Sequence, residues 1–297
     1  MIAALLTTVL FAATAVFARR AALALGATLA NFCRLLLAAG LLGLWTWWFG
    51  RGAGLAFEWF FLSGLAGFGL GGLMMFQALP RAGSNLSMLI VQTGSGIVAL
   101  IVERLWLGTT LTPAQLACVL AVVAGVAIGL APRALPAVSR RTLLLGAGCA
   151  GLSAVGQGLG AVLSRRAFAA ARDLGGTVDP GTAAFERALA GLLVAGLALF
   201  VAHRQARALH VPLRADRRAK AWPWVLANTM AGPVLGVACF QWALSTTPAG
   251  IVQPIVAAAP LLTAPIAWRF GEAIPRGHYF LGASLAVGGA ALLTYLR

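Results

Sequence analysis

The chain has 297 residues, of which 61% are hydrophobic and only 10% are charged, and its mean hydropathy is +0.91. A soluble domain of this length needs far more polar surface, so the composition excludes a soluble globular protein. The formal net charge of +15 would favour nucleic-acid binding in a soluble chain. Here the basic residues lie at the ends of apolar runs, where lipid headgroups lie, so we expect a lipid bilayer and no nucleic acid as partner.

A helix that crosses a bilayer needs about 20 apolar residues, and the charged clusters divide the chain into ten runs of that kind. The predicted spans are residues 2–20, 28–49, 58–79, 84–107, 112–131, 142–166, 181–203, 222–245, 248–270 and 275–296. Tryptophans close the second span and open the eighth, as is typical of the membrane interface. The sequence therefore predicts an all-α integral membrane protein with ten transmembrane helices.

An internal repeat is the strongest pattern in the chain. Segment 15–21 (Ala-Val-Phe-Ala-Arg-Arg-Ala) matches segment 161–167 (Ala-Val-Leu-Ser-Arg-Arg-Ala). Four more matches follow in the same order: Phe32–Arg34 with Phe185–Arg187, Gly67 and Gly71 with Gly232 and Gly236, 76–79 with 240–244, and 124–126 with 287–289. Such colinearity indicates a duplicated chain. We place the first repeat at 1–131, a linker at 132–141 and the second repeat at 142–297.

Each half contains five predicted spans. Because five is odd, the second half enters the membrane from the opposite side, and the halves are related by a pseudo-two-fold axis in the membrane plane. This inverted repeat is the architecture from which alternating access is built. We therefore predict two inverted five-helix repeats.

The order of several motifs resembles a known family. These motifs are the Phe-x-Arg at the start of spans 2 and 7, the Ala-Leu pairs ending spans 3 and 8, and the run Pro260–Pro265 leading into Gly271 and Glu272. Over nearly the whole chain, they resemble the drug/metabolite transporter superfamily, specifically its EamA-type branch. The resemblance implies transport of small metabolites, such as amino acids, or of drugs. The family's Gly-Glu after the fourth helix is Gly108-Thr109 here, so the two halves need not act symmetrically.

Polar residues inside the spans are candidates for a substrate cavity between the halves, which we expect spans 3, 4, 8 and 9 to line. In the fourth span Asn85, Gln92 and Glu103 return to nearly the same helix face at about 100° per residue. The predicted lining residues are Gln77, Asn85, Gln92, Ser95, Gln157, Asn228, Gln241 and Gln253. The alternative is hydrogen bonding between helices, at about 0.6 kcal/mol per contact. For Gln77 and Gln241, solvation near the helix ends explains the polarity equally well.

The ninth span carries three prolines, Pro254, Pro260 and Pro265. Each removes a backbone donor and leaves a carbonyl free, so the helix can kink or break. A gating helix and a static kink both fit this pattern.

Charged residues inside the spans have two interpretations each. Arg34 and Arg187 occupy equivalent positions and could contact an anionic group of a substrate, although snorkelling to the headgroups is favoured. Glu103 could carry a proton, but its neighbour Arg104 and its place near a helix end favour an interfacial ion pair.

Enzyme chemistry has little support. The cysteines lie inside apolar runs without paired spacing, and the histidines lie in or beside loops. The sequence contains no zinc helix, phosphate-binding loop or nucleophile turn. We therefore predict no catalytic residue, no metal and no cofactor.

We predict a secondary transporter in the plasma membrane that moves a small organic metabolite, amino-acid-like or drug-like, by alternating access. One alternative is a translocator of lipids or lipid-linked headgroups on the same scaffold. Another is a non-transporting membrane scaffold or a membrane enzyme. Lys and Arg are more frequent in the connections after the odd-numbered spans, which places both termini outside the cell. The family resemblance implies cytoplasmic termini instead.

Overall fold

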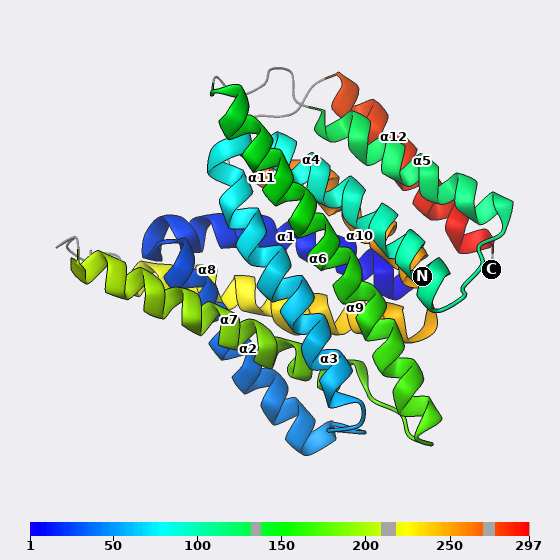
Figure 1. Ribbon diagram of the computed structural model, residues 1–297, viewed down its shortest axis with the longest axis horizontal. Coiled ribbons are helices and arrows are strands. Elements are labelled where there is room, and N and C mark those ends of the chain that lie inside the picture. The colour runs from blue at the N-terminus through cyan, green and yellow to red at the C-terminus, as the bar shows by residue number, and fades with distance from the viewer. Residues whose placement is uncertain (132–137, 209–217, 270–276, 297) are drawn as a thin grey trace.

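The computed structural model describes residues 1–131, 138–208, 218–269 and 277–296, and the regular elements in these ranges are helices (Figure 1). In chain order they are α1 (Ile2–Leu25), α2 (Ala27–Phe49), α3 (Phe57–Gly64), η1 (Leu65–Gly71), α4 (Gly72–Trp106), α5 (Pro113–Leu130), α6 (Arg140–Asp173), α7 (Pro180–Ala208), α8 (Arg218–Thr229), η2 (Met230–Val234), α9 (Leu235–Thr246), α10 (Ala249–Ala257), α11 (Ala259–Arg269) and α12 (His278–Tyr295). The segments η1 and η2 are π-helices.

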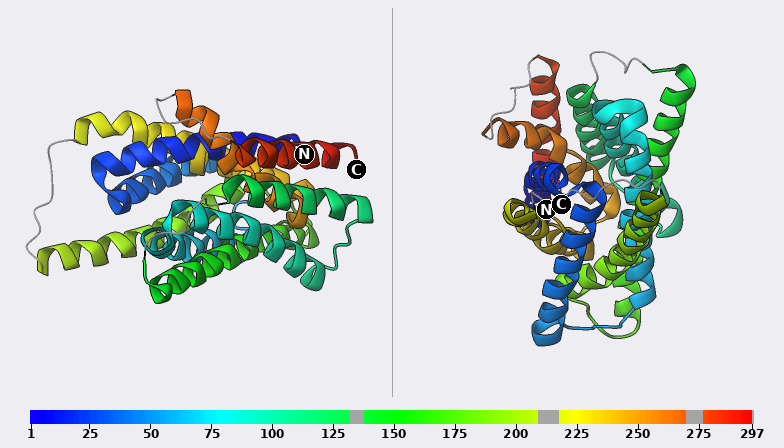
Figure 2. Two further views of the ribbon diagram at one scale, coloured as in Figure 1. Left: turned by 90° about the horizontal axis from the view of Figure 1, so that it is seen from above. Right: turned by 90° about the vertical axis from the view of Figure 1, so that its left-hand side faces the viewer.

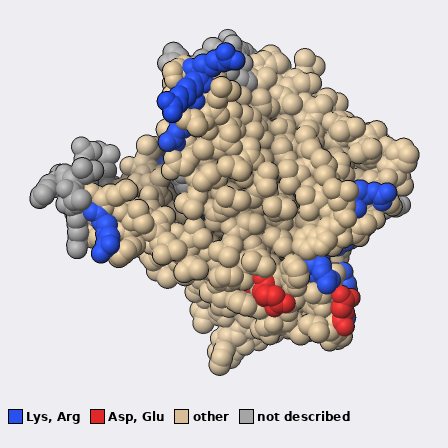
Figure 3. Space-filling model, in the orientation of Figure 1, with Lys and Arg blue, Asp and Glu red and all other residues tan. Residues whose placement is uncertain are grey.

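Eight helical stretches among the described residues are long and apolar enough to cross a membrane, so the chain is a multi-pass membrane protein. Two shorter apolar helices, Ala249–Thr263 and His278–Leu293, lie where the ninth and tenth spans are expected. The total of ten therefore stays a prediction. Figure 3 shows charged side chains mainly toward the edges of one face, with a broad uncharged region between them, as a lipid-covered surface requires.

Two predicted boundaries differ from the structure. The third and fourth spans share the helix α4, which turns at Gly83, where φ is 74°. Glycine adopts a positive φ without steric strain, so the chain can reverse there without a longer loop. The helix α6 begins at Arg140, inside the expected linker, because the Ser139 hydroxyl accepts a hydrogen bond from the Thr142 N–H at 3.2 Å. Residues 132–137 of that linker lie outside the described part.

Equivalent helices of the two halves run in opposite directions. The end of α2 meets the start of α7, because the N–H of Arg51 donates to the Asp179 carboxylate at 2.8 Å. The start of α5 meets the end of α12, because Gln115 Nε2 donates to the carbonyl of Leu296 at 2.9 Å. Helices α5 and α12 lie side by side in Figure 1. The repeat is therefore inverted.

The halves are interleaved and do not form separate bodies (Figure 2). Helix α1 packs against α8 and α9, and α6 packs against α3, η1 and α4. Glycines allow the close approach: a Cβ atom at Gly156 of α6 would lie only 2.6 Å from the carbonyl oxygen of Ala66 in η1. Because the first helix of each half packs against helices of the other half, residues from both halves surround one central space.

The π-helices occupy matching places in the third and eighth spans. Segment η1 contains Gly67 and Gly71, and η2 contains Gly232, which matches Gly67 in the repeat. A π-helix widens the helical turn and often marks a functional position. Segment η1 contacts α7, and segment η2 contacts both α2 and α7.

Candidate substrate cavity

A cavity of about 510 Å³ lies between the two halves. It is lined by residues from α1, α2, η1, α4, α6, α7, α9 and α10. Its polar lining side chains are Thr28, Asn31, Arg34, Gln77, Gln92, Gln157, Arg187 and Gln253. Three phenylalanine rings, from Phe11, Phe68 and Phe240, form part of its apolar wall. The cavity combines apolar surface with a small number of polar groups, as small-molecule sites do.

A larger hollow, of about 730 Å³, lies along α6 alone. Its lining is mostly aliphatic, and Leu144 and Leu145 in it are 62% and 54% exposed. A surface supplied by one apolar helix faces the lipid in a membrane protein and encloses no solute. The smaller cavity between the halves is therefore the candidate site.

Arg187 is buried within this cavity wall, with 5% of its surface exposed. Its Nη1 donates to the Ser164 hydroxyl at 3.2 Å, and its guanidinium lies 5.6 Å and 5.5 Å from the ring centres of Phe68 and Phe240. Its Nε has no hydrogen-bond partner among the described residues. No carboxylate of the described residues forms an ion pair with it. The snorkelling interpretation is wrong for Arg187, because its charge lies inside the bundle.

Arg34 is the repeat equivalent of Arg187 and also lines the cavity. Its Nε donates to Asn31 Oδ1 at 2.8 Å, one helical turn earlier on α2. Both arginines pack beside a glycine of a π-helix in the opposite half. A Cβ atom at Gly67 would lie 3.0 Å from Arg187 Nη2, and one at Gly232 would lie 3.7 Å from Arg34 Nη1. The glycines therefore leave room for the two guanidinium groups.

Four of the predicted glutamines line the cavity. Gln253 is 5% exposed; its Nε2 donates to the Ser95 hydroxyl at 3.1 Å, while its Oε1 has no partner. Gln92 and Gln157 are half-buried. Gln77 is exposed and its Oε1 accepts from Arg81 at 2.7 Å, so the cavity reaches the surface beside it.

Three other predicted residues do not line the cavity, because they make contacts between helices. The Ser95 hydroxyl lies between Gln253 and the carbonyl of Gln92, to which it donates at 3.2 Å. Asn228 Oδ1 accepts from Thr14 at 3.0 Å. Gln241 Nε2 donates to Ser164 at 3.1 Å. The side chain of Asn85 lies outside the described part.

The proline-rich ninth span is broken at Ala258, between α10 and α11. Neighbouring helices stabilise the break. The Thr8 hydroxyl donates to the carbonyl of Ile255 at 3.2 Å. The Tyr279 hydroxyl donates to the carbonyl of Leu261, which Pro265 deprives of its helical donor. Pro254 lies beside Gly96 of α4, where a Cβ atom would be 3.2 Å from the proline ring.

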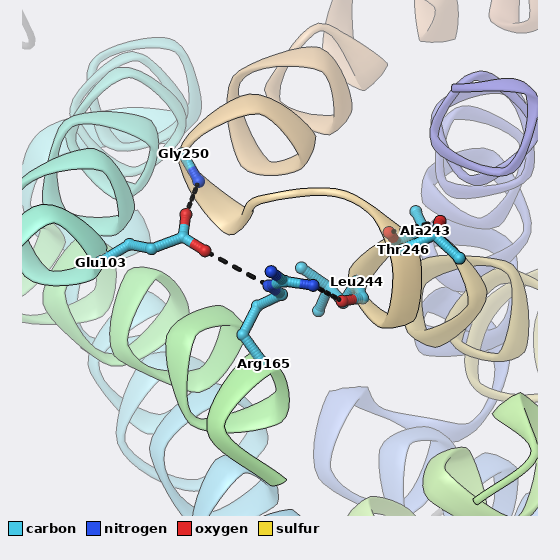
Figure 4. A network of polar contacts seen from close by, with 6 residues as sticks. All are labelled: Glu103, Arg165, Ala243, Leu244, Thr246 and Gly250. Atoms are coloured by element: carbon cyan, nitrogen blue, oxygen red, sulfur yellow. Dashed lines mark hydrogen bonds and ion pairs between the residues drawn. The ribbon is translucent and has the colours of Figure 1, made fainter. Parts of the chain in front are cut away.

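A network of polar contacts joins Glu103 of α4, Arg165 of α6 and the backbone of Leu244 and Gly250 (Figure 4). Glu103 is 2% exposed; its Oε1 lies 3.3 Å from Arg165 Nε, and its Oε2 accepts from the N–H of Gly250 at 2.7 Å. Arg165 Nη1 also donates to the carbonyl of Leu244 at 2.9 Å. The ion pair expected near Arg104 is therefore formed with α6 instead, between a buried Glu103 and an Arg165 whose side chain is 19% exposed.

Gln77 and Glu103 lie on opposite sides of the helix bundle. Gln77 precedes the turn at Gly83, whereas Glu103 lies near the far end of the span Leu86–Trp106 that follows this turn. The cavity is thus open on one side of the bundle, and the network joining α4, α6 and the connection between α9 and α10 lies on the other.

Thr28, Asn31 and the three phenylalanines were not expected in the cavity. Residues of spans 3, 4, 8 and 9 line the cavity, as expected, and residues of spans 1, 2, 6 and 7 line it as well. One signal was present in the sequence, because Asn31 precedes Arg34 by three residues and therefore shares its helix face. The phenylalanines had no such signal, since aromatic residues occur throughout apolar spans.

These features define a multi-pass membrane protein with an inverted repeat and a central cavity. The model of the EamA-like transporter family matches residues 1–130 and 144–295, and the chain belongs to this family. The resemblance inferred from the motifs is confirmed, and the protein is a membrane transporter of the drug/metabolite transporter type.

A solved structure described as "Crystal structure of protein" is similar in fold, with a TM-score of 0.76 and 21% sequence identity. The match covers 99% of this chain and 96% of the other. No curated protein matches the chain.

Proposed function

We propose that this protein is a secondary transporter that moves a small organic solute across the plasma membrane by alternating access. The observation that carries the proposal is the cavity between two inverted halves, with its mouth at Gln77 and the Glu103–Arg165 network at the opposite end. Its volume of about 510 Å³ suits a small organic molecule. Inverted halves can exchange their conformations, which would open the opposite side of the same cavity.

In this proposal Gln92, Gln157 and Gln253 hydrogen-bond to the solute inside the cavity, and Gln77 contacts it at the mouth. Ser95 orients Gln253, because its hydroxyl accepts from the glutamine amide. Asn228 and Gln241 support the site through interhelical hydrogen bonds.

The broken ninth span would serve as the moving element. Pro254 lies on the cavity side of the break at Ala258, and Pro260 and Pro265 lie beyond it. Helices α10 and α11 can change their relative direction at Ala258, because Pro260 has no N–H to donate and the Ala258 N–H donates three residues back, to the carbonyl of Ile255. Opening the other side also requires the contacts of Glu103 with Arg165 and Gly250 to separate.

The test is a panel of metabolites and drugs, measured first by thermal stabilisation of the purified protein and then by flux into liposomes. Gln92→Ala should weaken both signals for active solutes, whereas the matched variant Gln205→Ala, at an exposed position of α7, should not. Phospholipids with fluorescent headgroups form a further arm of the panel. Movement of these lipids without any solute flux would favour a lipid translocator. If nothing stabilises the protein or moves, the proposal is wrong.

A further inference from the structure

The cavity carries positive charge, and the part of the chain that the structure describes supplies no acidic side chain to its lining. Arg34 and Arg187 contribute two guanidinium groups, and no Asp or Glu lies among the described lining residues. Glu186 precedes Arg187 but faces elsewhere, because its Oε1 accepts from the N–H of Gly54 at 2.9 Å. Glu103 is occupied by Arg165 and Gly250. A cation taken out of water without an anionic partner is costly, which is a reason to expect that a bound anion supplies the partner.

The donors of Arg187 are only partly used. Its Nη1 donates to Ser164, whereas its buried Nε has no partner. A guanidinium presents a rigid planar fork that matches the two oxygens of a carboxylate. The rings of Phe68 and Phe240 lie beside the guanidinium, and Arg187 is only 5% exposed. An anion bound there would experience a stronger attraction than it would at an exposed arginine.

The rest of the cavity suits an uncharged, largely apolar body. Phe11, Phe240 and Val256 line it with apolar surface, and the buried Oε1 of Gln253 is free to accept one hydrogen bond. A cationic solute would meet two positive charges and no carboxylate among the described lining residues. The ammonium group of a zwitterion would find amide oxygens and the Thr28 hydroxyl, but no anionic partner there.

We infer that the transported solute is an organic anion, a carboxylate on an apolar or aromatic body, whose charged group is bound by Arg187 and Arg34. This inference rests on the proposed transport function and names its substrate class. The symmetric positions of the two arginines, each beside a π-helix glycine of the opposite half, place one cation from each repeat at the same cavity.

The experiment compares compounds that share a carbon skeleton and differ in the charge of their polar group. One series is 3-phenylpropionate, its amide, 3-phenylpropylamine and phenylalanine; a second is hexanoate, hexanamide and hexylamine. Each is tested with the full-length protein for thermal stabilisation and for liposome flux. The carboxylates should bind and move best, with the amides and amines weaker by roughly tenfold to a hundredfold, as the loss of charged hydrogen bonds predicts.

Variants then locate the charge recognition. Arg187→Gln should weaken carboxylate binding by at least about tenfold and remove the difference between acid and amide. Arg204→Gln makes the same change at an exposed position of the same helix and should have no effect. The series on the wild-type protein tests the charge preference even if Arg187→Gln does not fold.

The outcomes separate the two claims. If amides or amines are bound and carried as well as the acids, or if other solutes are carried but no carboxylate is, the organic-anion inference is overturned while transport stands. Retention of the acid preference in a folded Arg187→Gln protein overturns the assignment to this arginine. If no solute of any charge binds or moves, the proposed function itself fails.

Discussion

The Glu103 carboxylate lies 3.3 Å from Arg165 Nε, although the two residues are 62 positions apart and belong to different halves. Glu103 is at the end of α4 and Arg165 is in α6. Arg165 also donates to the carbonyl of Leu244, before the connection between α9 and α10, and Glu103 accepts from the N–H of Gly250, after it. One ion pair thus holds three parts of the bundle together on the side away from the cavity mouth.

Glu103→Gln should lower the thermal stability of the protein. The glutamine can still accept from the N–H of Gly250, but Arg165 loses its anionic partner, and breaking a buried pair costs about 3–5 kcal/mol. The measurement is the midpoint of thermal unfolding of the purified protein in detergent. The double variant Glu103→Gln/Arg165→Met should recover part of the loss, since it leaves no unpaired charge. Equal stability of Glu103→Gln and the wild type would show that the pair does not hold this end together.

Asp179 is expected to make stability depend on pH. Burial acts to raise the pKa of this carboxyl, but hydrogen bonds from Thr182, the N–H of Arg51 and the indole of Trp45 outweigh it and lower the pKa from 3.8. A group with a lowered pKa stabilises the fold above its unfolded value, and this contribution is lost as the pH falls through the folded pKa. The wild type should therefore be more stable than Asp179→Asn at neutral pH.

That advantage should shrink as the pH falls below the ordinary value of 3.8. The check is the free energy of unfolding of both proteins across this range. A difference that stays constant with pH would mean that the Asp179 hydrogen bonds do not depend on its charge.

Gly282→Ala should destabilise the contact between α5 and α12. A Cβ atom at this position would lie 2.3 Å from the backbone nitrogen of Gly129 and 2.4 Å from the carbonyl oxygen of Gly125. The helices would have to separate, at a cost of about 1–3 kcal/mol for overpacking. Gly288→Ala is the matched control in the same helix, because nothing lies within 4 Å of its added methyl group. Equal unfolding temperatures for the two variants would contradict this packing.

The membrane-spanning helices and the duplication could be predicted from the sequence, because both are visible as patterns of residue type along the chain; eight of the ten predicted spans are long and apolar enough among the described residues. Apolar length predicts the helices, and the matched order of segments such as 15–21 and 161–167 predicts the duplication. The antiparallel contacts of Arg51 with Asp179 and of Gln115 with Leu296 agree with the inverted repeat.

The residues that line the cavity could be predicted from the sequence only in part, because the polarity of a side chain does not determine which neighbouring residue it contacts. Gln253 and Gln241 look alike in sequence, yet Gln253 reaches the cavity and Gln241 is fully buried against Ser164. Rotation of each helix about its axis decides between them, and that rotation depends on packing against distant helices. The same reason explains why Arg165, and not Arg104, became the partner of Glu103.

The most direct test of alternating access is side-specific labelling of Gln92→Cys in sealed vesicles. The four native cysteines, Cys33, Cys118, Cys149 and Cys239, are first replaced by alanine. A membrane-impermeant maleimide should react with position 92 when added to either side, and an active solute, added in excess because the variant binds it more weakly, should slow both reactions. Trp47→Cys, at a site 83% exposed near the end of α2, should react from one side only and reports that the vesicles are sealed. If position 92 reacts from one side alone, the cavity does not alternate and the proposed mechanism is wrong.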